Sequence, residues 1–116
     1  MAKIVVVDDE LEIAELVAEI AKDQNHQVFM ACNAEQAFKL CLNEKPQLVI
    51  SDIMMPGLDG YTLCRQLKTE PQLKGIKVIL MTAGSFKHDI IKGFYDNFIK
   101  KPFDVEDIEK LLQASL

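Results

Sequence analysis

Five short apolar runs, each about as long as a β-strand, restrict the folds open to this chain. They cover residues 4–7, 28–30, 48–50, 78–81 and 98–99. Several of them are continuous rather than alternating, which is typical of strands buried on both faces of a parallel sheet. Parallel neighbours need a long crossover connection, usually a helix, between successive strands. The runs therefore predict an α/β fold.

Helical patterns fill the gaps between the runs. Apolar residues at helical spacing occur within residues 13–20, 34–41, 61–67, 90–94 and 108–112. Asn33 with Gln36 and, later, Asp104 are typical helix-start residues, and proline and glycine fall between elements. The chain thus predicts five βα units in one domain, residues 1–116, as an open doubly wound sheet with helices on both faces.

Charge and cysteine content exclude several classes of function. A net charge of −5 argues against non-specific binding to nucleic acid or to an anionic membrane surface, and no apolar stretch approaches the length of a membrane span. Cys32, Cys41 and Cys64 are odd in number and lack metal-site spacing. We expect them to be reduced, small apolar residues in a cytoplasmic protein.

Polar residues follow four of the predicted strands, at the edge where ligands bind in open α/β sheets. Asp8 and Asp9 follow the first strand, Asp52 the third, Thr82 the fourth and Lys101 the fifth. Each alone has an ordinary structural role, such as a turn, a helix cap or a solvated charge. Together they place acids, a hydroxyl group and an ammonium group at one edge.

The charges of these residues point to phosphoryl chemistry. Asp8, Asp9 and Asp52 carry −3, and Lys101 leaves −2, which a divalent cation such as Mg²⁺ would neutralise. A carboxylate can attack phosphorus as a nucleophile. Lys101 and Thr82 suit the phosphoryl oxygens, whose charge must be neutralised in the transition state. The pattern predicts a phosphoryl group on Asp52.

The segments VVVDDE, DIMMPGLDG, MTAG and FIKKPF resemble, in this order, the signature segments of response regulator receiver domains (CheY-like) of two-component signalling. The resemblance covers the entire chain. It implies a parallel sheet of order 2-1-3-4-5 and Mg²⁺-dependent phosphoryl transfer from a sensor histidine kinase or a histidine phosphotransfer protein. It implies a signalling domain that catalyses only its own phosphorylation and dephosphorylation, and a downstream protein target that the sequence does not identify.

The resemblance also implies a role for each site residue. Asp52 matches the family's phosphoacceptor. The metal-binding positions are matched by Asp8, Asp9, Asp52 and the backbone carbonyl of Met54. Thr82 and Lys101 match the two residues that contact the phosphoryl group. Phe98 matches the switch aromatic, which moves into space that Thr82 vacates, although its pattern alone favours a core aromatic. Pro102 matches a position where the preceding Lys–Pro bond is typically cis.

The chain departs from the family pattern in one region. From Thr82 to Lys101 there are 19 positions (101 minus 82), about three fewer than usual, or nearly one helical turn. The usual Gly-Ala-Asp-Asp stretch is replaced by Gly-Phe-Tyr-Asp-Asn at residues 93–97. This predicts a short or irregular fourth helix.

Three other readings stay open at this stage. A phosphatase of the haloacid dehalogenase type should have a second acid at Met54, and a flavodoxin-like carrier should lack the acidic Asp8-Asp9 turn. A degenerate receiver would bind partners without being phosphorylated, which only a chemical test excludes.

Overall fold

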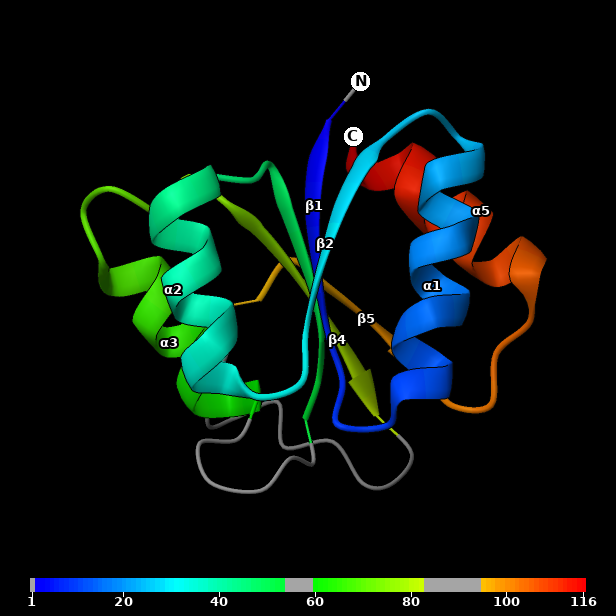
Figure 1. Ribbon diagram of the computed structural model, residues 1–116, viewed down its shortest axis with the longest axis horizontal. Helices are drawn as coiled ribbons and strands as arrows, with labels where there is room; N and C mark the ends of the chain where they lie inside the picture. Colours follow the sequence, from blue (N-terminus) through cyan, green and yellow to red (C-terminus); the bar gives the residue numbers. More distant parts are fainter. Residues whose placement is uncertain (1, 54–59, 83–94) are drawn as a thin grey trace.

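The computed structural model describes residues 2–53, 60–82 and 95–116 (Figure 1). In these ranges strands alternate with helices, except that β5 is the next described element after β4. The elements are β1 (Lys3–Val7), α1 (Leu11–Asp23), β2 (Gln27–Ala31), α2 (Ala34–Glu44), β3 (Leu48–Asp52), α3 (Gly60–Thr69), β4 (Lys77–Thr82), β5 (Asn97–Lys100) and α5 (Val105–Ser115). The predicted short fourth helix falls within residues 83–94, outside the described residues. Met54, the predicted backbone metal ligand, also lies outside them.

The five strands form one parallel sheet in the order β2-β1-β3-β4-β5. Helices α1 and α5 cover one face and α2 and α3 the other (Figure 1). The predicted α/β topology is therefore confirmed. Strand order reverses at β1 and β3, so the crevice expected at a topological switch point lies beyond the carboxyl ends of these two strands.

The continuous apolar runs fill two cores at once. Along β1, Ile4 and Val6 pack in a cluster with residues of α1 and α5, while Val5 and Val7 pack in the cluster beneath α2 and α3. All four side chains are fully buried. Because successive side chains of a strand point to opposite faces, a strand covered on both faces has no solvent-facing position for a polar residue.

Two of the predicted helix starts have the expected caps. The Asn33 side chain accepts the backbone N–H of Gln36 at 2.8 Å, and the Gln36 side chain accepts the N–H of Cys32 at 2.9 Å, one residue beyond the usual capping box. Asp104 and Asp107 form a full reciprocal capping box at the start of α5. Both caps order the loops that enter these helices from the site edge of the sheet.

The apolar stripe on α1 is wider than the face that the sheet and α5 cover. Val17 and Ile20 are buried as predicted, whereas Leu16 is 39% exposed and Ile13 is half-buried.

None of the helices in the described ranges is long and apolar enough to cross a membrane.

The three cysteines are free, as expected, but they differ in exposure. Cys41 and Cys64 are fully buried, and burial raises the pKa of each thiol to about 12. Cys32 is exposed at the loop before α2. Its backbone N–H donates to the side-chain oxygen of Gln36 at 2.9 Å, at the exposed start of α2.

Alkylation should therefore select one thiol of the folded chain. The thiolate is the reactive form of cysteine. The two buried thiols have a pKa of about 12, so at any lower pH they remain mostly protonated as well as inaccessible. At mildly alkaline pH, iodoacetamide should add once, at Cys32, as peptide mass mapping would show. The chain unfolded in guanidinium should add three groups, one for each cysteine. A second adduct on the folded chain would contradict the described packing.

Candidate functional site

Asp8 lies directly after β1, and both its backbone and its side chain form hydrogen bonds to nearby backbone groups. Its backbone N–H donates to the carbonyl oxygen of Ala31 at 3.2 Å, and its Oδ1 accepts the N–H of Glu10 at 2.9 Å. The second bond satisfies a backbone donor at the start of α1, whose N-cap residue, Glu10, supplies no side-chain cap. Asp8 is 1% exposed. Its other carboxylate oxygen, Oδ2, faces the site.

Asp52 is the last residue of β3 and is almost fully buried. The neighbouring strand β4 pairs with it through Met81, and the Ser51 hydroxyl donates to its backbone carbonyl at 2.9 Å. Asp52 thus ends a strand whose backbone is fixed on both sides, because β1 pairs with the other edge of β3. A rigid strand end is a precise mount for a reactive side chain.

Gly60, to which the sequence assigned no role, lies against the same strand end. Its backbone N–H donates to the Ile53 carbonyl at 2.9 Å. A Cβ added to it would lie 2.8 Å from the Cα of Ile53 and overlap the Asp52 carbonyl oxygen. Only glycine lets α3 begin this close to β3. The available signal was the Asp-Gly pair at positions 59–60, directly before an apolar stripe at helical spacing.

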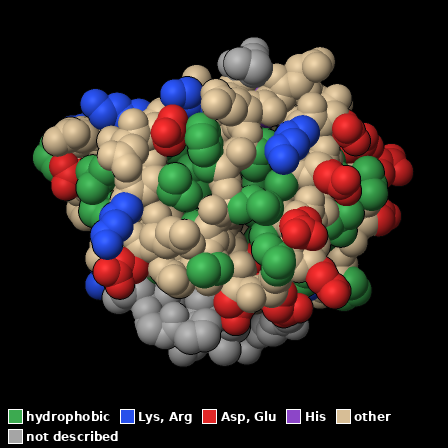
Figure 2. Space-filling model, viewed as in Figure 1, with side chains coloured by type: hydrophobic (Ala, Val, Ile, Leu, Met, Phe, Trp, Pro, Cys, Tyr) green, Lys and Arg blue, Asp and Glu red, His purple; other side chains and the backbone are tan. Residues whose placement is uncertain are grey.

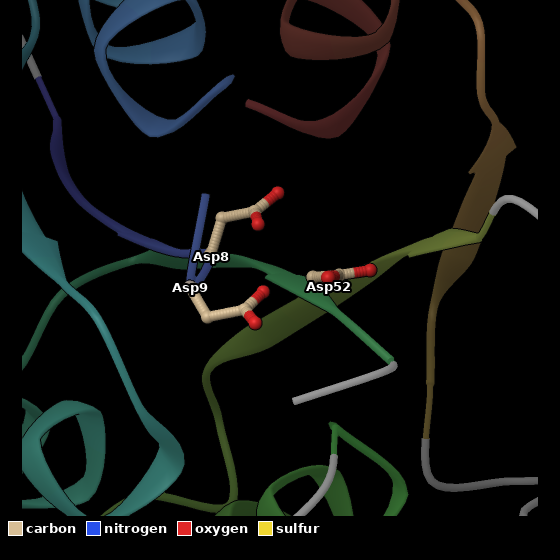
Figure 3. Close-up of side chains that lie close together, drawn as sticks. All are labelled: Asp8, Asp9 and Asp52. Atoms are coloured by element: carbon tan, nitrogen blue, oxygen red, sulfur yellow. The ribbon is translucent and has the colours of Figure 1, made fainter. Parts of the chain in front are cut away.

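The carboxylates of Asp8, Asp9 and Asp52 form one cluster, with an oxygen of each within 4.8 Å of the others. Figure 3 shows all three extending to the same side of the sheet edge, two from the end of β1 and one from β3. Asp8 and Asp52 are buried and Asp9 is exposed. The cluster is therefore open to solvent at Asp9 and closed beneath.

Lys101 is the counter-charge of this cluster. Its Nζ lies 3.0 Å from Asp8 Oδ2 and 3.4 Å from Asp52 Oδ1, and its side chain is 12% exposed. Burial lowers the pKa of Lys101, but the hydrogen bond to Asp8 and the charges of Asp52 and Asp8 outweigh burial, so the pKa lies above its ordinary value. Lys101 is therefore a permanent ammonium group between two carboxylates.

Thr82 and Phe98 lie on the two strands next to the cluster. Thr82, the last residue of β4, is 2% exposed, and its carbonyl accepts the backbone N–H of Lys101 at 2.7 Å. Phe98 is half-buried in β5 and pairs with Leu80 of β4. Two positions further along the same strands, Lys100 pairs with Thr82. The Lys101–Pro102 peptide bond is cis, the conformation that the resemblance implied.

The structure thus brings together Asp8, Asp9, Asp52 and Lys101, and it places Thr82 at the same edge of the sheet. Carboxylate oxygens are the ligands preferred by hard divalent cations such as Mg²⁺, which needs only one or two of them beside water and phosphate oxygens. Three carboxylates and one ammonium leave a net charge of −2. The donor set and its charge both fit a divalent cation.

Residues 4–113 match the family model described as "Response regulator receiver domain". The family match identifies this chain as a signalling module rather than a classical enzyme. The chain belongs to this family, the CheY-like receiver domains of two-component signalling.

Comparison with curated proteins gives relatives longer than this chain. Response regulator Rre1 of Synechocystis sp. is 34% identical over 97% of this chain and 51% of its own length. A DNA-binding dual master transcriptional regulator, RpaA, also of Synechocystis sp., is 31% identical over 100% of this chain and 49% of its own length. The chain spans about half the length of the curated relatives it matches.

Solved structures agree along the full chain. The chemotaxis response regulator CheY4 of Vibrio cholerae superposes with a TM-score of 0.93 at 26% identity, covering 100% of this chain and 99% of that one. The signal receiver domain of a signal transduction histidine kinase from Syntrophus aciditrophicus gives a TM-score of 0.88 at 33% identity, covering 100% and 90%.

Proposed function

We propose that this chain accepts a phosphoryl group from a phosphohistidine onto Asp52, with Mg²⁺ held by Asp8, Asp9 and Asp52. The observation that carries the proposal is the buried Asp52 carboxylate, 3.4 Å from the Lys101 ammonium and beside two further carboxylates. A structural ion pair would need one acid, whereas among the described residues this cluster holds two acids more than Lys101 neutralises. The excess suits a site for a cation and a phosphoryl group.

The transfer is a displacement at phosphorus. A carboxylate oxygen of Asp52 forms the new P–O bond while the P–N bond of the phosphohistidine breaks, and the electron pair of that bond returns to the imidazole nitrogen. The product is an aspartyl phosphate and a free histidine. Because the transition state of such a transfer is loose, the protein mainly positions the groups and neutralises charge.

Each nearby residue has a part in that task. Lys101 already lies between Asp8 and Asp52 and would form an ion pair with a phosphoryl oxygen on Asp52. The Thr82 hydroxyl, at the end of the adjacent strand, would donate to another oxygen. Mg²⁺, when bound, would shield the phosphoryl oxygens from the carboxylates. The backbone carbonyl of Met54, outside the described residues, remains the fourth predicted metal ligand.

Phosphorylation would change the surface through Thr82 and Phe98. Movement of Thr82 toward the phosphoryl group would vacate space at the end of β4, and the half-buried Phe98 ring on the adjacent strand would turn into it. The altered surface around β4 and β5 would then bind a downstream partner.

The donor is expected to bind over the amino-terminal half of α1. A groove of about 440 Å³ there is lined by Ile13, Leu16, Lys101, Pro102 and Phe103. Lys101 belongs to both the groove and the acidic cluster, so a protein that delivers a phosphohistidine to Asp52 must cover this surface. Exposed acidic side chains gather on the same side of the molecule (Figure 2), which favours a donor with an apolar ridge flanked by basic residues.

A small donor with a P–N bond tests the proposal without the unknown kinase. With phosphoramidate and Mg²⁺, intact mass should show one phosphoryl adduct, and the adduct should be absent when the metal is chelated. No adduct, with Mg²⁺ binding shown by calorimetry, would instead support a receiver that binds partners without phosphorylation.

Mg²⁺ should also stabilise the fold. At a concentration tenfold above its dissociation constant, a cation that binds only the native state adds about 1.4 kcal/mol to the free energy of unfolding. Thermal unfolding should therefore shift upward with Mg²⁺. Asp9→Asn should lose most of this shift, since Asp9 is the exposed member of the cluster. Asp23→Asn, at the far end of α1, should keep it. An equal shift in both variants would place the cation elsewhere.

A further inference from the structure

The half-buried Phe98 ring contacts a second aromatic ring, that of Tyr95. The two centroids are 6.4 Å apart and the ring planes meet at 73°, an edge-to-face arrangement. Aromatic pairs prefer this geometry, which stabilises them beyond the area they bury. Both rings also pack against the core cluster beneath α2 and α3. Tyr95 belongs to the segment 93–97, where the chain departs from the usual family pattern.

The residue after Tyr95 is fixed to two neighbouring elements. The backbone N–H of Asp96 donates to the Val78 carbonyl at 2.8 Å, and Asp96 Oδ2 accepts the Val78 N–H at 2.7 Å. The same oxygen accepts a hydrogen bond from Lys68 Nζ of α3 at 2.7 Å, and Lys68 also donates to the Ile76 carbonyl. The backbone beside Tyr95 is thus held against β4 and α3.

Tyr95 and Thr82 lie toward opposite ends of β4, with Phe98 between them. Asp96 is bonded at Val78, Phe98 pairs with Leu80, and Thr82 ends the strand. A Phe98 ring that turns toward Thr82 therefore moves away from Tyr95. Because Asp96 holds the adjoining backbone, a main-chain shift of Tyr95 in the same direction would disturb the bonds of Asp96 to Val78 and Lys68.

We propose that Tyr95 is a positioning residue for Phe98, and that its edge-to-face contact favours the described orientation of the Phe98 ring over the orientation turned toward Thr82. The inference rests on the function proposed above and adds a residue to its switch. Loss of the contact should raise the population of the turned orientation by about two- to tenfold.

Tyrosine fluorescence offers a direct readout of the contact. The chain has two tyrosines, Tyr61 and Tyr95, and no tryptophan, so Tyr61→Phe leaves Tyr95 as the single emitter. Saturating Mg²⁺ and beryllofluoride, a phosphoryl mimic, should change the emission of Tyr95. The change should be absent in the same protein with Asp52→Asn or with Phe98→Leu.

A double-mutant cycle separates this role from a purely structural one. Tyr95→Leu should tighten beryllofluoride binding, measured by calorimetry, by about two- to tenfold, because no ring contact is then lost on switching. Tyr95→Phe, which keeps the ring, should bind as the parent does. In the Phe98→Leu background, Tyr95→Leu should have no effect on binding.

The outcomes distinguish the two proposals. Asp52-dependent binding without a change in Tyr95 emission, or equal affinities for Tyr95→Leu and its parent, would overturn the role of Tyr95 and leave the phosphoryl site standing. Absence of beryllofluoride binding to the parent protein would contradict the proposed function, and the role of Tyr95 with it.

Discussion

Lys101→Met is expected to lower the free energy of unfolding by about 3 kcal/mol, the cost of removing one partner of a buried ion pair. The Lys101 side chain is 12% exposed and contacts both Asp8 and Asp52. Methionine keeps most of the apolar stem but removes the ammonium group that contacts Asp8 and Asp52 in the described part of the chain. Urea unfolding in the absence of Mg²⁺ measures the loss, and phosphorylation by acetyl phosphate should slow by about a hundredfold.

The adjacent lysine provides a matched control for Lys101. Lys100 is exposed on β5, and Lys100→Met should change the free energy of unfolding by no more than about 0.5 kcal/mol. Mg²⁺ should restore part of the stability of Lys101→Met, because a divalent cation supplies the missing positive charge. Equal urea midpoints for the two variants would show that Lys101 does not neutralise the cluster.

Gly60→Ala is expected to destabilise the chain by about 2 kcal/mol, although alanine is the better helix former. The added methyl group would overlap the Asp52 carbonyl oxygen and lie 2.8 Å from the Cα of Ile53. Both contacts are backbone atoms, which cannot rotate aside as a flexible side chain can. Either α3 or the end of β3 must shift, and Asp52 shifts with β3. Urea unfolding and the phosphorylation rate should therefore decline together.

Gly75 supplies the comparison for Gly60. A Cβ added there meets no atom within 4 Å, so Gly75→Ala should change the free energy of unfolding by no more than about 0.5 kcal/mol and leave phosphorylation unaltered. A Gly60→Ala variant as stable and as active as Gly75→Ala would contradict the described approach of α3 to β3.

The sequence predicted those features that follow from local pattern and from the geometry of parallel sheets. The apolar runs placed the strands, and the rule that ligands bind at strand ends placed Asp8, Asp52 and Lys101 at one edge. The order of the strands came only from the family resemblance, because periodicity does not state which strands are neighbours. The structure confirms that order.

Other features depend on contacts between residues far apart in the chain. The exposure of Leu16 depends on how far α5 and the sheet cover α1. The bond from Lys68 to Asp96 joins residues 28 positions apart. No helical or strand period reports such pairs. The sequence therefore pointed to the charged cluster but not to the close approach at Gly60 or to the ring contact between Tyr95 and Phe98.

Reductive trapping is the most direct test of the central claim, that Asp52 carries the phosphoryl group. After incubation with acetyl phosphate and Mg²⁺, borohydride converts an aspartyl phosphate to homoserine, and peptide sequencing by mass spectrometry locates the changed residue. We expect homoserine at position 52 alone, and none when Mg²⁺ is chelated. Homoserine at position 8 or 9, or an unchanged Asp52 in a protein that has gained a phosphoryl group, would contradict the assignment.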